Sequence, residues 1–255
     1  MQFLADLESI WYGPPANSAP TLVFLHEGLG SASMWRDFPR RLSDATGYGA
    51  LVYSRRGYGS SPPAELPRPI GYMHDEADVL AEVMREHNVC EAVVVGHSDG
   101  ASIALIYAGR NASGPLRALI LEAPHVFVET LSVESIAAMK RAWETTDLRG
   151  RLGRYHRDVE NAFRGWNDVW LDPGFRDWNI EELLGEIEVP LLLIQGGDDE
   201  YGTWKQVEAI ERQVRGPVET LLVPGARHAP HRDQPELVLR KMATFVKTLR
   251  ERGGN

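Results

Sequence analysis

A strand, a tight turn and a helix follow one another between Glu91 and Ala108, and this order constrains the fold more than any other feature. The run EAVVV has the composition of a buried strand, and the stretch ASIALIYA has that of a buried helix. Between them lies Gly96-His97-Ser98-Asp99-Gly100, which matches the G-x-S-x-G nucleophile elbow. Such a turn strains the serine backbone by about 1–3 kcal/mol and lifts its hydroxyl in front of the helix N-terminus. The segment therefore predicts an exposed, nucleophilic Ser98.

Short apolar runs alternate with helix-like segments along most of the chain. Further strands are expected at residues 21–25, 49–53, 116–121, 190–194 and 219–223, and helices at residues 33–45, 72–86, 98–108, 203–214 and 236–249. The strand runs are continuously apolar, which is typical of a sheet covered by helices on both faces. The pattern therefore predicts an α/β fold with a mostly parallel central sheet and right-handed crossovers.

The alternation stops between about residues 125 and 188, where no strand-like run appears. We expect this stretch to be a helical cap, or lid, inserted above the sheet. Residues 1–124 and 189–255 would then form the core.

Aromatic residues are concentrated in this proposed cap and make it the expected roof of a substrate pocket. Trp143, Trp166 and Trp170 lie there, and Leu29 follows the first expected strand. These four side chains are candidates for contacts with a hydrophobic substrate, because ligand pockets are lined mainly by apolar and aromatic groups. The alternative is that the tryptophans only pack the cap onto the core.

Composition excludes several classes of protein. There are 27 Lys and Arg residues against 36 Asp and Glu, a formal net charge of −9, which argues against a nucleic-acid-binding surface. No apolar run approaches the roughly 18–20 residues that a membrane helix needs. The one cysteine, Cys90, excludes an internal disulfide and argues against a cysteine metal site. We expect a cytoplasmic protein that acts on a small molecule.

A serine hydroxyl needs a base to act as a nucleophile at neutral pH, and the base needs an acid to orient it. In a strand–elbow–helix architecture both follow the serine along the chain, in loops after later strands. The candidate acids are Asp198, Asp199 and Glu200, and the candidate bases are His228 and His231. Position alone does not decide within either set.

Three motifs together resemble the α/β-hydrolase superfamily. They are His26-Glu27-Gly28-Leu29-Gly30-Ser31, Ser54-Arg55-Arg56-Gly57-Tyr58-Gly59-Ser60-Ser61 and Gly96-His97-Ser98-Asp99-Gly100. The similarity covers about residues 21–249. It is greatest to the branch of valacyclovir-hydrolase-like esterases and meta-cleavage-product C–C hydrolases, because Asp-Gly follows the serine and the segment GGDDEYGT is rich in aspartate. The resemblance implies a serine nucleophile, an acyl-enzyme, and neither a metal nor a cofactor.

The resemblance also selects the partners of Ser98. The family places its acid three residues after the glycine that ends a strand, which here is Asp199 after Gly196. Its histidine lies in a Gly-x-x-His segment, which here gives His228. A catalytic triad of Ser98, His228 and Asp199 is therefore implied.

The family's oxyanion hole uses two backbone N–H groups, and these correspond here to Asp99 and Gly28. This chain departs from the family by having Glu27 where a glycine is usual. A carboxylate beside a developing oxyanion is unfavourable, so we expect Glu27 to point away or to pair with a cation such as Arg55 or Arg56. Losing one oxyanion donor typically costs about 3 kcal/mol of transition-state stabilisation.

The leading functional hypothesis is hydrolysis of a carboxylic ester of a small to medium hydrophobic substrate. The same triad would also serve C–C bond cleavage in a meta-cleavage dienoate, or hydrolysis of a lactone, thioester or amide. A protein of another class, a ligand receptor or signalling partner on the same fold, is a further alternative.

Overall fold

The computed structural model describes residues 6–111 and 114–253. Within this part of the chain one seven-stranded sheet has the order β1-β3-β2-β4-β5-β6-β7. The first strand pairs antiparallel with β3, and every other neighbouring pair is parallel. The strands are β1 (Ser9–Tyr12), β2 (Thr21–Leu25), β3 (Gly49–Tyr53), β4 (Ala92–His97), β5 (Leu116–Glu122), β6 (Leu191–Gly196) and β7 (Val218–Val223).

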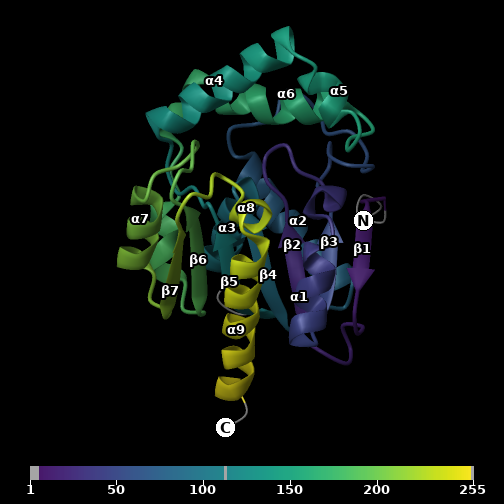
Figure 1. Cartoon of the computed structure of the whole chain (residues 1–255), viewed down its shortest axis with the longest axis vertical. Coiled ribbons are helices and arrows are strands. Elements are labelled where there is room, and N and C mark those ends of the chain that lie inside the picture. The colour runs from purple at the N-terminus through teal and green to yellow at the C-terminus, as the bar shows by residue number, and fades with distance from the viewer. Residues whose placement is uncertain (1–5, 112–113, 254–255) are drawn as a thin grey trace.

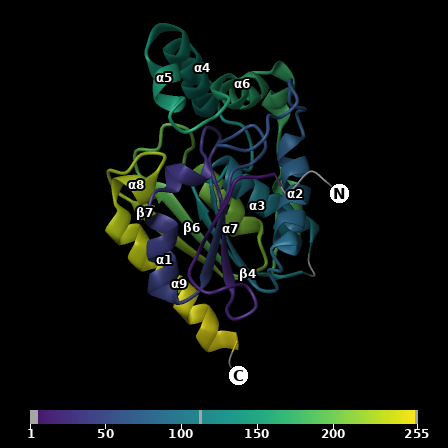
Figure 2. The ribbon, with the colours of Figure 1, turned by 90° about the vertical axis from the view of Figure 1, so that its right-hand side faces the viewer.

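Helices cover both faces of the sheet (Figures 1 and 2). On one face, α1 (Phe38–Thr46) and α9 (Pro235–Gly253) share a hydrophobic core with Leu22 and Phe24 of β2. On the other, α2 (Tyr72–Glu86), α3 (Asp99–Arg110) and α7 (Lys205–Gln213) share a second core with Val23 and Leu25. Successive side chains of β2 thus point into the hydrophobic cores on opposite faces of the sheet, which explains why the strand runs are continuously apolar.

Three helices lie across the carboxyl ends of the strands, at the top of Figure 1. They are α4 (Thr130–Thr145), α5 (Leu148–Leu152) and α6 (Val159–Trp170). The short 3-10 helices η2 (Pro173–Asp177) and η3 (Glu181–Glu186) then lead back to β6. Because η3 packs along α3, with Leu183 against Gly109, the last part of the 125–188 segment lies against the core. The domain boundaries at residues 125 and 188 stay a prediction.

Two elements differ from those expected from the sequence. Residues 33–45 do not form one helix, because Arg36 has φ 56° and separates the 3-10 turn η1 (Ala32–Trp35) from α1. The strand β1 was not anticipated, since it has four residues at the edge of the sheet and none of them is fully buried. None of the described helices is long and apolar enough to cross a bilayer.

Candidate active site

Ser98 occupies the turn between β4 and α3 in a strained conformation. Its φ of 54° and ψ of −118° lie in a region that side-chain-bearing residues rarely adopt. The flanking glycines permit the turn, because a Cβ at Gly96 would lie 2.6 Å from Cα of Ala101, and one at Gly100 would lie 2.6 Å from the carbonyl carbon of Leu25. The local sequence therefore produces the nucleophile-elbow geometry that the motif predicts.

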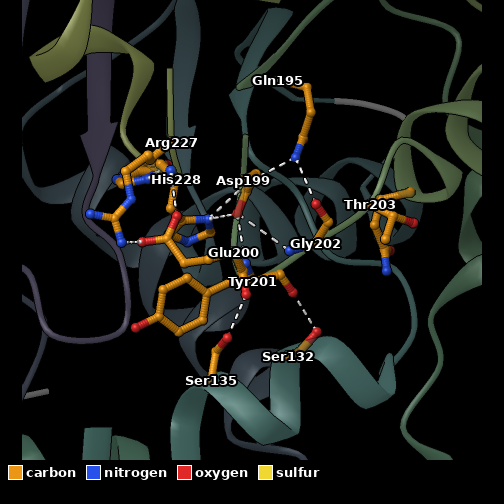
Figure 3. Close-up of polar contacts among 12 residues, drawn as sticks. Ser132, Ser135, Gln195, Asp199, Glu200, Tyr201, Gly202, Thr203, Arg227 and His228 are labelled. Atoms are coloured by element: carbon orange, nitrogen blue, oxygen red, sulfur yellow. Dashed lines mark hydrogen bonds and ion pairs between the residues drawn. The ribbon is translucent and has the colours of Figure 1, made fainter. Parts of the chain in front are cut away.

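His228 and Asp199 form a hydrogen-bonded pair from two different loops (Figure 3). Nδ1 of His228 lies 2.9 Å from Oδ1 and 3.0 Å from Oδ2 of the carboxylate. Asp199 also accepts hydrogen bonds from the Tyr201 amide at 2.8 Å and from Nε2 of Gln195 at 2.7 Å. Because a carboxylate only accepts, Nδ1 of His228 carries the proton and Nε2 is left to accept one.

The environment keeps Asp199 ionised. Burial by itself raises its pKa, but the charge of His228 and the hydrogen bonds from His228 and Tyr201 outweigh burial and lower it. The loop that carries Asp199 is also fixed to the first helix above the sheet. Ser132 and Ser135 of α4 each donate to it at 2.5 Å, to the carbonyls of Tyr201 and Glu200 (Figure 3).

A cavity of about 230 Å³ contains the serine and the histidine. Among the described residues no hydrogen bond joins the side chains of Ser98 and His228. Such bonds are commonly long or misaligned without substrate and tighten in the complex. The structure thus brings both groups to one cavity without the closed hydrogen bond between them.

The other predicted site residues divide into two groups. Gly28, Leu29, Asp99, Trp166 and Trp170 all line this cavity. Trp143 is not among its lining residues and instead stacks on Phe163, with ring centroids 4.1 Å apart and an interplanar angle of 11°. Its place is explained by aromatic packing within the proposed cap, which the sequence had left as the alternative.

Asp99 contributes two features to the cavity. It is the first residue of α3, so its backbone N–H has no partner within the helix and is available as a donor. Its side chain accepts from Tyr72 Oη at 2.6 Å and from Nε1 of Trp170 at 3.2 Å. Burial raises the pKa of Asp99 despite the charge of Arg55 and these hydrogen bonds.

Glu27 pairs with a cation that the sequence analysis did not name. Its Oε1 lies 2.9 Å from Nη2 of Arg232, in α8 (Pro230–Asp233), and its Oε2 lies 3.5 Å from Nδ1 of His97. Arg55, one of the expected partners, instead donates to the Glu27 carbonyl at 3.0 Å. Burial opposes ionisation, but Arg232 and His97 hold the pKa of Glu27 well below its usual range.

His125 is a cavity residue that sequence reasoning missed. It lies three residues beyond β5, is almost fully buried, and its ring lies 5.9 Å from that of His228. Burial, followed by the charge of His228, lowers its pKa to about 4, so it is neutral at physiological pH. The signal was present in the sequence: a polar residue just past a strand. The expected cap begins at residue 125, so the sequence pattern assigns His125 to the cap and not to the site.

Three buried side chains outside the cavity lining have the spacing of metal ligands. Ligand atoms of His97, Glu122 and His231 lie within 4.8 Å of one another. Nδ1 of His231 is already bonded to Glu122 at 2.6 Å, and Nε2 of His97 to the His228 carbonyl at 2.7 Å. We therefore interpret the three as a hydrogen-bonding network.

Comparison with known proteins identifies the family. The model of the alpha/beta hydrolase family matches residues 22–241. The chain belongs to this family. It is therefore an enzyme of the α/β-hydrolase fold, as the motifs predicted.

Similar proteins have several activities. This α/β-hydrolase is 23% identical over 253 residues to a 2-succinyl-6-hydroxy-2,4-cyclohexadiene-1-carboxylate synthase of Enterobacter sp. (strain 638), covering 89% of this chain and 92% of that one. It is 23% identical over 269 residues to the bifunctional esterase/perhydrolase DCH of Acinetobacter calcoaceticus, covering 93% and 94%. The solved esterase EaEST from Exiguobacterium antarcticum superposes with a TM-score of 0.73 at 20% identity, covering 94% of each chain. That likeness shows the fold alone.

Proposed function

We propose that this α/β-hydrolase is a serine esterase that cleaves carboxylic esters of small to medium hydrophobic compounds. The observation that carries the proposal is that His228, which is paired with Asp199, lines the same cavity as a strained Ser98. Nucleophilic acyl transfer requires such an arrangement, with an oriented base and a serine hydroxyl in one cavity.

In the proposed reaction Nε2 of His228 takes the proton of Ser98 while Oγ attacks the ester carbonyl carbon. The backbone N–H groups of Gly28 and Asp99 would stabilise the resulting oxyanion. The imidazolium then gives its proton to the departing alkoxide, which leaves an acyl-enzyme. Water, activated by the same histidine, releases the acid and restores the serine. Asp199 holds the imidazole tautomer and stabilises its positive charge throughout.

The lining of the cavity favours a neutral substrate. Several of the lining residues have large apolar or aromatic side chains, among them Leu29, Met34, Ile136, Met139, Leu152 and Trp166. Among the lining residues Arg232 is the one arginine or lysine, and its guanidinium is bound to Glu27 at 2.9 Å. A polyanionic dienoate would need an unpaired cation here, so the pairing supports an ester over a meta-cleavage product. We also infer a reducing, cytoplasmic location from the single cysteine.

A substrate panel tests this proposal. Initial rates would be measured for p-nitrophenyl esters from acetate to octanoate and for a meta-cleavage dienoate, with wild type and Ser98→Ala. We expect turnover of the shorter neutral esters and loss of most of it in the variant. Faster turnover of the dienoate would replace the esterase proposal with C–C hydrolysis. Ligand binding without turnover of any acyl compound would favour a receptor.

A further inference from the structure

An ion cluster joins the oxyanion loop, which we define as residues 26–31, to the fully buried His97 and to the more exposed Arg232. We call Glu27, His97 and Arg232 the clamp. Glu27 belongs to the oxyanion loop, His97 immediately precedes Ser98, and Arg232 follows His228 by four residues. The carboxylate of Glu27 contacts both Arg232, at 2.9 Å, and His97, at 3.5 Å.

His97 connects this cluster to the base. Its Nε2 lies 2.7 Å from the backbone carbonyl of His228. A carbonyl only accepts, so Nε2 must carry a proton. Nδ1, on the other side of the ring, faces Oε2 of Glu27. Only the imidazolium form presents a proton to both partners, whereas the neutral tautomer that bonds to the carbonyl turns a lone pair toward the carboxylate.

We propose that His97 is a positioning residue whose protonated form clamps the oxyanion loop to the loop of His228. Glu27, which departs from the family's glycine, is then the anionic half of the clamp, and Arg232 holds that carboxylate from the other side. The inference rests on the proposed function, because its consequence is the relative placement of the Gly28 donor and the His228 base.

The surroundings of His97 support a charged ring. The groups that face it are Glu27 from the oxyanion loop, Glu122 from β5, both the backbone carbonyl and the imidazole ring of His228, His231 and Arg232 from α8, and the Trp35 ring; the two rings of His97 and His228 have centroids 5.1 Å apart. Burial lowers its pKa, but Glu27 and then Glu122 outweigh both burial and Arg232, and the pKa is raised above 6.5. The clamp is therefore intact at lower pH and opens as pH rises through that pKa.

The clamp can be tested by removing a negative charge and a positive charge near His97 in two separate variants. Glu27→Gln removes the strongest influence that keeps His97 charged, whereas Arg232→Gln removes a cation that disfavours its charge. The rate of Ser98 phosphonylation by a neutral fluorophosphonate and the ¹⁵N-imidazole NMR titration of His97 would be followed from pH 5 to 10. Arg41→Gln, which removes the distant pair with Glu236, is the matched control.

We expect the alkaline fall in labelling rate to follow the His97 titration. The midpoints of both should move about one pH unit or more lower in Glu27→Gln and move higher in Arg232→Gln. His97→Gln, whose amide can still donate to the His228 carbonyl, should lower the rate about tenfold and abolish the alkaline fall. Midpoints that stay fixed, or that move in the same direction in both charge variants, would overturn the clamp.

Failure of the clamp and failure of the esterase proposal are distinguishable. If wild-type Ser98 is not labelled at any pH, the proposed function fails, and the NMR titrations alone decide whether Glu27 and Arg232 control His97 in opposite directions. If labelling is fast but its alkaline fall persists in His97→Gln, the serine is activated as proposed and the clamp is wrong.

Discussion

The indole of Trp166 lies directly on the backbone of Gly28, so that a Cβ at residue 28 would come within 3.0 Å of Cε2 and overlap the pyrrole ring. A residue of α6 thereby packs against the glycine that is proposed to supply one of the two oxyanion donors. Gly28→Ala keeps the N–H but displaces the indole, and overpacking of this kind costs about 1–3 kcal/mol. We expect a 10- to 100-fold fall in kcat/KM for p-nitrophenyl butyrate.

A second substitution separates this steric effect from a loss of the donor. Trp166→Leu makes room for the new methyl group, so the double variant should recover part of the activity lost in Gly28→Ala. Steady-state kinetics of the two single variants and the double variant measure the coupling. Strictly additive losses would mean that Trp166 does not control the position of Gly28.

His125 should make the protein sensitive to acid. Its pKa of about 4 in the fold lies below the 6.5 of an unfolded histidine, so the unfolded chain binds more protons between these values. The stability that His125 contributes by staying neutral is therefore fully present above about pH 6.5 and is lost as the pH falls toward 4. Between pH 8 and pH 5, wild type should lose about 2 kcal/mol more unfolding free energy than His125→Phe.

Urea unfolding at the two pH values measures this difference. The wild-type protein contains other buried histidines, so the comparison with the variant isolates the contribution of His125. Equal acid losses in the two proteins would show that residue 125 is not held neutral by the fold.

Trp143 and Trp170 should behave differently when replaced. Trp143 stacks on Phe163 outside the cavity lining, whereas Trp170 lines the cavity and donates to Asp99 at 3.2 Å. Trp143→Ala should lower stability by about 1–3 kcal/mol, because the indole is only partly buried, while leaving KM for short esters within about twofold. Trp170→Phe should change KM, because it alters the cavity wall and removes a hydrogen bond. Thermal unfolding and steady-state kinetics distinguish the two effects.

The sequence predicted the sheet and the elbow because their signals are local. The run EAVVV is apolar enough for a buried strand, and the two glycines around Ser98 leave room for the tight turn that follows it. Both requirements come from residues close together in the chain. The partners of Glu27 were not predictable in this way. Arg232 lies 205 residues further along the chain, and only the packing of α8 beside the oxyanion loop brings the two side chains together. Similarly, no sequence period distinguishes Trp143, which packs on Phe163, from Trp166, which lines the cavity.

Among the three adjacent carboxylates after β6, Asp199 should be the one that matters for catalysis. Asp198 is exposed, and Glu200 binds Arg227 at 2.7 Å and accepts from the His228 amide at 3.2 Å, so only Asp199 meets the imidazole. Asp199→Asn should lower kcat about 10⁴-fold, because an amide cannot hold the productive imidazole tautomer. Asp198→Asn should leave kcat within about twofold, as expected for an exposed group, and serves as the matched control.

Glu200→Gln should lower kcat by an intermediate amount, because losing its contacts with Arg227 and the His228 amide loosens the loop that carries His228. Rates measured with one p-nitrophenyl ester rank the three variants, and a greater loss in Asp198→Asn than in Asp199→Asn would transfer the orienting role to Asp198.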